Sequence, residues 1–299
     1  MYDDILIPTD GSEHAVRAAE HGAYIADAFD ATLHLLTVVD VDAAAGPFSA
    51  GGVDEEYVER LKSKARTAID ALDGAVSAVE TVQSSVVTGQ PSTAILDYVA
   101  DRDVDLVAMG THGRRGLSRY LVGSVAERVV RQSPVPVLTV RASERSAVEE
   151  GYDQILVPTD GSDYAAAAVA HALAIAERAG ARVHAVSVVN LGDIATGADV
   201  GVPPEFVEQF ETLAEEAVVS VATAARERGL DVETSVSSGV PARELLDYVE
   251  ENPIDLVVMG THGRTGWDRL LLGSTAERLV RRSPTPVLTV RRSDEEGEA

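Results

Sequence analysis

Short apolar runs alternate with longer amphipathic stretches along the whole chain. The segment "DILIP" at Asp4–Pro8 has the length and composition of a buried strand. The alanine-rich stretch that follows repeats its apolar positions with a helical period, and Ser12 stands where an N-cap residue is preferred. A second strand is predicted over Thr32–Val39. The pattern therefore predicts a chain that alternates between strand and helix.

The same alternation continues through the first half of the sequence. The stretch "DEEYVERLKSKARTAIDAL" predicts a long amphipathic helix, and a strand over Val79–Val87 leads to a helix that opens with Pro91. Two further apolar runs, "VDLVAMG" and "VPVLTV", have the length of buried strands and flank a helix predicted over Ser124–Gln132. The order βαβαβαβαβ predicts a parallel sheet with helices on both faces.

The whole pattern occurs twice. "ILIPTDGS" at Ile5–Ser12 returns as "ILVPTDGS" at Ile155–Ser162, an offset of 155 − 5 = 150 residues. We therefore expect two tandem, doubly wound parallel-sheet domains of five strands each, over residues 1–141 and 153–292. A polar, patternless linker is expected at residues 142–152, and residues 293–299 form an acidic tail.

The composition argues against several kinds of partner and of chemistry. A net charge of −24 argues against nucleic acid and anionic membranes as partners. The only lysines are Lys62 and Lys64, and an acidic chain so poor in lysine resembles halophilic proteins. No apolar run is long enough to span a membrane, and the N-terminus leads directly into a predicted strand, so we expect a soluble, cytoplasmic protein. The chain has no cysteine, which excludes thiolate catalysis and cysteine-based zinc sites.

Glycines with a fixed spacing follow the fourth predicted strand of each half. In the first half the pattern G-x2-G-x9-G-S comprises Gly110, Gly113, Gly123 and Ser124. Glycine lets backbone N–H groups approach phosphate oxygens closely, and the start of a helix favours an anion. In parallel sheets, ligands bind beyond the carboxyl ends of the strands, where the strand order reverses. The spacing therefore indicates a phosphate-binding loop at that edge.

These residues also have structural interpretations. The glycines can be turn residues, and "SVAE" at Ser124–Glu127 and "STAE" at Ser274–Glu277 both match a capping box. Asp10 and Asp160, which follow the first strand of each half, can form Asx turns leading into the next helix.

Two further pairs of residues leave the same choice open. Met109 and Met259 can line a ligand or pack against the sheet. Arg114 and Arg264 can neutralise phosphate or form solvated ion pairs.

Four features together resemble the universal stress protein family in its tandem form. They are "PTDGS" after the first strand, "MGTHGR" after the fourth, the glycine spacing and the terminal strand "PVPVLTVR". The likeness covers both halves almost end to end. Family members with the complete glycine motif resemble ATP binders. The resemblance implies an adenine nucleotide alpha hydrolase-like, Rossmann-like fold that binds ATP, or AMP or ADP in its place, with Mg²⁺ held through the phosphates.

The resemblance also implies roles for particular residues. Asp10 and Asp160 would hydrogen-bond the ribose, while Val38 and Val188 would contact adenine. The glycine loops would hold the phosphates, with Thr275 in the place of Val125. The implied nucleotide-binding residues are Pro8, Thr9, Asp10, Val38, Met109, Gly110, Gly113, Arg114, Gly123, Ser124 and Val125, with Pro158, Thr159, Asp160, Val188, Met259, Gly260, Gly263, Arg264, Gly273, Ser274 and Thr275.

Several catalytic classes lack their usual parts in this sequence. There is no G-x4-G-K-[ST] loop, no G-x-S-x-G nucleophile elbow and no zinc-type histidine pair. We therefore expect a nucleotide-dependent stress-response module that signals to an unidentified protein partner, with at most slow ATP hydrolysis. The alternatives are an interaction scaffold that binds no nucleotide or AMP, and a slow ATPase.

The family resemblance also bears on assembly. It implies pairing of the last strands, Val135–Arg141 and Thr285–Arg291, within one chain, which makes an intramolecular pseudo-dimer and covers an exposed sheet edge. Further homodimerisation through other surfaces is left open.

Overall fold

The computed structural model describes residues 1–40, 55–113, 123–148, 151–190, 204–263 and 272–292. The chain divides into two compact units, Met1–Val148 and Glu149–Ala299. Each unit folds around its own parallel sheet, and the predicted α/β architecture is confirmed in both.

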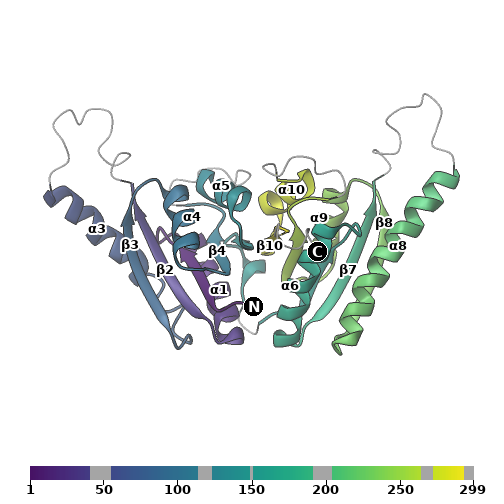
Figure 1. The fold of residues 1–299 in the computed structure, drawn as a ribbon, viewed down its shortest axis with the longest axis horizontal. Coiled ribbons are helices and arrows are strands. Elements are labelled where there is room, and N and C mark those ends of the chain that lie inside the picture. The colour runs from purple at the N-terminus through teal and green to yellow at the C-terminus, as the bar shows by residue number, and fades with distance from the viewer. Residues whose placement is uncertain (41–54, 114–122, 149–150, 191–203, 264–271, 293–299) are drawn as a thin grey trace, which may run out of the picture. The chain divides into compact units, whose positions relative to one another are not determined.

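The first unit alternates strands and helices in the predicted order (Figure 1). Its strand Thr32–Val39 and its helix Ser124–Gln132 have the predicted bounds, whereas three strands begin two or three residues later than predicted. The elements are β1 (Asp4–Pro8), α1 (Glu13–Phe29), β2 (Thr32–Val39), α3 (Glu55–Asp70), β3 (Val82–Thr88), α4 (Pro91–Asp101), β4 (Leu106–Gly110), α5 (Ser124–Gln132), β5 (Val137–Val140) and the 3-10 turn η1 (Glu144–Ser146).

The second unit repeats this order. Its elements are β6 (Gln154–Pro158), α6 (Asp163–Ala179), β7 (Arg182–Val189), α8 (Pro204–Glu227), β8 (Val232–Ser238), α9 (Pro241–Glu251), β9 (Leu256–Gly260), α10 (Ser274–Arg282) and β10 (Val287–Val290). Its helix α8 is longer than α3, its counterpart in the first unit.

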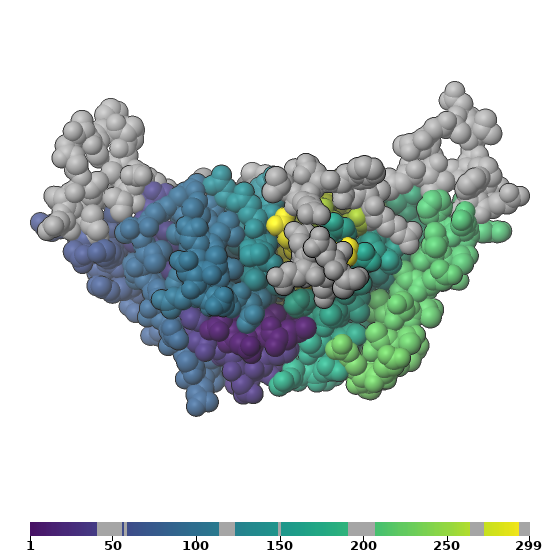
Figure 2. Space-filling view, viewed as in Figure 1, coloured from purple at the N-terminus to yellow at the C-terminus, as the bar shows by residue number. Residues whose placement is uncertain are grey.

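The strand order of the first unit is β3-β2-β1-β4-β5, with all neighbours parallel. The order in the second unit is β8-β7-β6-β9-β10. Right-handed crossovers place α1 and α3 on one face of the first sheet and α4 and α5 on the other. Atoms of the α4–α5 layer cover much of that sheet in the space-filling view (Figure 2). The chain reverses direction across the sheet between β1 and β4, which is where a ligand site is expected.

The central strands form the core of each unit. Ile5, Leu6 and Ile7 of β1 are fully buried because helices cover both faces of the sheet. On one of these faces Gly22 of α1 lies so close to the sheet that a Cβ there would be 2.8 Å from Ile7 and 3.2 Å from Ala108. The alanine-rich sequence of α1 therefore serves close packing of the helix on the sheet.

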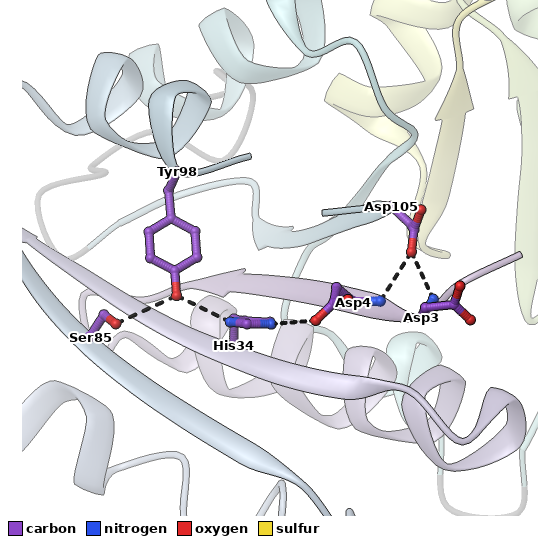
Figure 3. A network of polar contacts seen from close by, with 6 residues as sticks. All are labelled: Asp3, Asp4, His34, Ser85, Tyr98 and Asp105. Atoms are coloured by element: carbon purple, nitrogen blue, oxygen red, sulfur yellow. Dashed lines mark hydrogen bonds and ion pairs between the residues drawn. The ribbon is translucent and has the colours of Figure 1, made fainter. Parts of the chain in front are cut away.

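A polar network joins the amino ends of the strands in the first unit (Figure 3). The N–H groups of Asp3 and Asp4 donate to Asp105 Oδ2 at 2.7 and 3.1 Å. The buried His34 lies 2.7 Å from Asp4 Oδ1 through Nε2 and 3.1 Å from the Tyr98 hydroxyl through Nδ1. The network ties β1, β2, α4 and the approach to β4 together at the end of the sheet opposite the expected ligand edge.

The second unit keeps this network with one change. Gln154 stands in place of the acidic residue, and its Oε1 accepts from His184 Nε2 at 2.6 Å. His184 Nδ1 lies 2.8 Å from the hydroxyl of Tyr248, and Asp255 accepts the N–H of Gln154 at 2.8 Å. Because an amide oxygen only accepts, His184 carries a proton on Nε2. Burial lowers the pKa of His184, which favours the neutral ring.

Part of the segment expected to link the domains packs on the first unit. The N–H of Ala142 donates to His14 Nδ1 at 2.8 Å, and Ser143 and Ser146 form a capping box around η1. The carbonyl of Ser146 lies 2.8 Å from Nε2 of His21, which is 1% exposed. Burial lowers the pKa of His21 to about 4. The segment was expected to be patternless, but its first residues form a short ordered turn.

Candidate functional site

The loop after β1 makes a tight turn at the carboxyl edge of the sheet. The N–H of Thr9 extends the strand ladder by donating to Leu36 O at 2.8 Å. The Thr9 hydroxyl oxygen then accepts from Gly11 N at 3.0 Å, and Gly11 has a φ of 72° that favours glycine. The chain therefore leaves the sheet within a few residues of Pro8.

Asp10 connects this loop to the glycine loop after β4. Its Oδ1 accepts from Ser12 N at 3.0 Å, which makes the Asx turn that was one interpretation of the sequence. A Cβ at Gly113 would lie 2.6 Å from Asp10 Oδ2, so the carboxylate lies directly against this glycine. Ser12 begins α1 as its N-cap, as predicted, by accepting from Ala15 N. Because a carboxylate offers several acceptor positions, the Asx turn is compatible with a ligand contact at Asp10.

Two other glycines of the motif lie in close contact with backbone atoms, and the contact is tightest at Gly110. A Cβ at Gly110 would lie 2.8 Å from the backbone carbon of His14, in the first turn of α1. Gly123 donates its N–H to Thr111 O at 2.7 Å, and a Cβ there would be 3.3 Å from the same oxygen. The motif therefore draws the start of α1, the loop after β4 and the start of α5 together.

The start of α5 corrects the capping-box interpretation. The N-cap is Gly123, with φ −62° and ψ 143°, and no side chain caps the helix within the part of the chain that the structure describes. Ser124 is therefore the first helical residue, and Glu127 lies one position too late to reach back to the N-cap. Glu127 instead pairs with Arg131 at 2.9 Å. The uncapped N–H groups of the first turn suit an anion.

The corresponding interpretation of Ser274–Glu277 is wrong for the same reason. Gly273 is the N-cap of α10 and provides no side chain, while Glu277 pairs with Arg281 at 2.9 Å.

The second unit reproduces the rest of the arrangement. Asp160 Oδ1 accepts from Ser162 N at 3.0 Å, and a Cβ at Gly263 would lie 2.6 Å from Asp160 Oδ2. A Cβ at Gly260 would lie 2.7 Å from the carbonyl oxygen of Tyr164. The two units therefore hold the same backbone geometry at the same edge.

The remaining predicted residues lie around this edge. Those at the ends of the first strands are buried: Pro8, Thr9, Pro158 and Thr159. Val38 and Val188, near the ends of the second strands, are half-buried, as are Val125 and Thr275 in the first turns of α5 and α10. Ser124 and Ser274 are exposed.

Both methionines of the predicted sites are described by the structure, whereas both arginines are not. Met109 and Met259 are 4% and 6% exposed, so each side chain packs within its unit. Arg114 and Arg264 lie outside the described residues.

Sequence analysis did not single out His14, which lies beside the first site. Its ring centroid is 5.2 Å from that of His112, and the latter's Nδ1 is 3.0 Å from the Thr111 hydroxyl. Burial, and next the neighbouring His112, lowers the pKa of His14. The second unit has Tyr164 at this position, with its ring centroid 5.4 Å from His262. The contact between His14 and His112 joins the start of α1 to the loop after β4, and no local sequence pattern predicts it.

Fold and site together define a class of protein: a tandem, doubly wound α/β protein with one candidate ligand edge in each unit, at the reversal of strand order. The sequence profile described as "Universal stress protein family" matches residues 1–141 and 151–291. The chain belongs to the universal stress protein family.

Two relatives and one solved structure show the extent of the likeness. A universal stress protein of Methanocaldococcus jannaschii is 39% identical over 153 residues, which cover 50% of this chain and 87% of the relative. One of Mycolicibacterium smegmatis is 30% identical over 296 residues, or 96% of each chain. A crystal structure of a universal stress protein from Archaeoglobus fulgidus shares the fold, with a TM-score of 0.69, 24% identity and coverage of 98% of this chain and 97% of that one.

Two further features are absent from the described ranges: a helix able to span a membrane and a cluster of metal-ligating side chains. None of the helices there combines the length and apolar character needed to cross a membrane. In the same residues, no group of three or more His, Asp or Glu side chains is placed to hold a metal ion.

Proposed function

We propose that each unit binds an adenine nucleotide, ATP in the first instance, and that the chain acts as a nucleotide-dependent stress-response module. One observation carries the proposal. In both units, an aspartate after the first strand lies against a glycine of the loop after the fourth, beside a helix start whose N-cap is a glycine.

This arrangement suits the parts of a nucleotide. The carboxylates of Asp10 and Asp160 are acceptors for ribose hydroxyl groups, and Val38 and Val188 offer half-buried apolar surface near the base. Backbone N–H groups at the starts of α5 and α10 are donors for phosphate oxygens. Mg²⁺ would be held through the phosphates and would offset part of their charge.

The main alternative is an interaction scaffold with no nucleotide. The close packing at Gly110 and Gly113 favours it, because these contacts give the glycines an architectural role that needs no ligand. The starts of α5 and α10 favour the nucleotide proposal, because their first-turn N–H groups lie at the reversal of strand order and can donate to phosphate oxygens.

Calorimetric titration of the chain with ATP and Mg²⁺ tests the proposal. A double variant, Gly113→Val with Gly263→Val, places side-chain atoms where the two aspartates lie and should abolish binding. Gly74→Val is the matched control, because a Cβ at Gly74 meets nothing within 4 Å. Unchanged ATP affinity in a folded double variant would refute the phosphate-loop assignment.

We further propose that the chain hydrolyses ATP slowly at most, acts in the cytoplasm and signals to a protein partner. The domain bounds 1–141 and 153–292, the linker 142–152 and the pairing of the last strands within one chain belong to the same proposal.

A further inference from the structure

Arg128 of α5 is held by side chains at the start of α4 in the first unit. Its Nη1 donates to Gln90 Oε1 at 3.1 Å and to Ser92 Oγ at 3.4 Å. The Gln90 oxygen also accepts from the Thr93 hydroxyl at 2.6 Å. Both helix starts lie at the carboxyl edge of the sheet, since α4 follows β3 and α5 follows β4. Arg128 is exposed, and its guanidinium is held at the surface by the side chains at the start of α4.

The second unit keeps the arginine and loses the side chains that hold it. Arg278 corresponds to Arg128, while Val240 and Ala242 replace the glutamine and serine. Neither replacement can accept a hydrogen bond through its side chain. Val240 is 50% exposed, and Arg278 is exposed and makes no hydrogen bond or ion pair with any described residue.

Arg278 lies in the second turn of α10, within reach of the first turn of that helix. It lies four residues after Ser274, so the two side chains share one face of the helix. Long side chains on a helix lean over the turn that precedes them, which here is the turn with the uncapped N–H groups. The guanidinium can reach an anion held at that turn, and its fork of donors matches phosphate oxygens.

We infer that Arg278 determines specificity at the second site, where it favours nucleotides with the longer phosphate chain, while Arg128 is withheld from the first site by Gln90 and Ser92. The inference rests on the proposed function. It makes the two sites unequal although their glycine loops match: the second site discriminates ATP from AMP and adenosine more strongly than the first.

Two carboxylates of α9, Asp247 and Glu244, are candidates for an ion pair with Arg278 in place of a nucleotide phosphate. Arg243 lies 3.6 Å from Asp247 on the same helix, in an exposed ion pair. The Glu244 side chain folds over Gly239, where a Cβ would be 2.5 Å from its Oε1. Neither carboxylate pairs with Arg278. Glu244→Gln therefore serves as a charge control that should leave nucleotide discrimination unchanged.

The test isolates each site and then changes its arginine. Gly113→Val leaves only the second site open, and Gly263→Val leaves only the first. In each background the affinities for ATP, AMP and adenosine are measured by calorimetry with and without the arginine-to-glutamine change. Arg278→Gln should weaken ATP binding about threefold to fivefold, as expected for one partly exposed charge contact, and leave adenosine affinity unchanged. Arg128→Gln should leave the ratio of ATP to adenosine affinity unchanged at the first site.

A second pair of variants keeps both arginines and exchanges the side chains around them between the two units. Val240→Gln with Ala242→Ser should reproduce the loss seen for Arg278→Gln, because the new side chains hold the guanidinium. Gln90→Val with Ser92→Ala should raise the preference of the first site for ATP.

The outcomes separate the two proposals. Binding of ATP with the same discrimination in all these variants overturns the role of Arg278 and leaves the nucleotide proposal standing. Equal weakening of ATP and adenosine by Arg278→Gln also overturns it, since that result indicates a general structural effect. Absence of any nucleotide binding to the unmodified chain overturns the proposed function, and this inference with it.

Discussion

The buried histidine of α1 makes the stability of the first unit depend on pH. His21 is 1% exposed, and burial lowers its pKa from 6.5 to about 4. Its Nε2 lies 2.8 Å from Ser146 O, which a neutral ring reaches with the proton on Nε2. His21→Gln keeps a donor for this carbonyl and removes the titrating group.

The direction of the pH dependence of stability follows from the uptake of a proton by His21 in the folded and unfolded states. Between pH 6.5 and about 4 the unfolded chain binds a proton at His21 that the folded unit does not, so stability falls as the pH falls. The full effect, reached below both pKa values, is 2.5 pH units at about 1.4 kcal/mol each, or about 3.5 kcal/mol. At pH 5 the free energy of unfolding is lower by about 2 kcal/mol for this reason, and above pH 7 His21 no longer affects it.

Urea unfolding at pH 5.0 and 7.5, followed by pulse proteolysis with mass spectrometry, reports each unit separately. The first unit of the unmodified chain should lose about 2 kcal/mol more between these pH values than that of His21→Gln. His171→Gln is the matched control: burial lowers the pKa of His171 to about 4 as well, but the substitution acts on the second unit. An equal pH dependence of the first unit in the unmodified chain and His21→Gln would refute the reasoning.

Three further predictions concern architecture. Asp105→Ala removes the acceptor of two backbone N–H groups at the start of β1 and should destabilise the first unit by about 1–3 kcal/mol in urea unfolding; no change would show that water replaces it fully. Gly110→Ala places a Cβ 2.8 Å from the backbone of His14 and should cost about 1–3 kcal/mol in the same assay, whereas Gly74→Ala should not; equal effects would contradict the packing argument. Pairing of the last strands within one chain predicts that the chain stays folded as a 31.5 kDa particle in light scattering at low concentration, and unfolding of the chain whenever a dimer dissociates would contradict that pairing.

Local patterns predicted most of the fold. The period of apolar residues placed the strand Thr32–Val39 and the helix Ser124–Gln132 at their observed bounds, because each is a continuous run between clear turn signals. The strand expected from Val79 begins only at Val82, because the N–H of Val79 donates back to Val76 O at 3.1 Å and the chain joins the sheet at Thr81, whose carbonyl accepts from Leu33 N at 2.9 Å. The repeat and the β/α order together were enough to predict the edge at which the candidate site lies.

Contacts between distant residues could not be predicted in the same way. The capping box at Ser124 fits the sequence, and only the backbone shows that Ser124 is already the first helical residue and that Gly123 is the N-cap. The bond between His21 and Ser146 joins residues 125 apart, and the contacts of Arg128 with Gln90 and Ser92 cross between two helices. A one-dimensional pattern contains no such distances.

The central claim is tested most directly by counting the nucleotide that the purified chain carries. The protein is purified in molar KCl and denatured, and the released nucleotide is identified by chromatography and quantified per chain, with the Gly113→Val, Gly263→Val double variant treated in parallel. The account predicts one ATP for each unit in the unmodified chain and none in the double variant. No released nucleotide, together with no calorimetric binding of added ATP and Mg²⁺, would contradict it and leave the glycine loops a purely structural role.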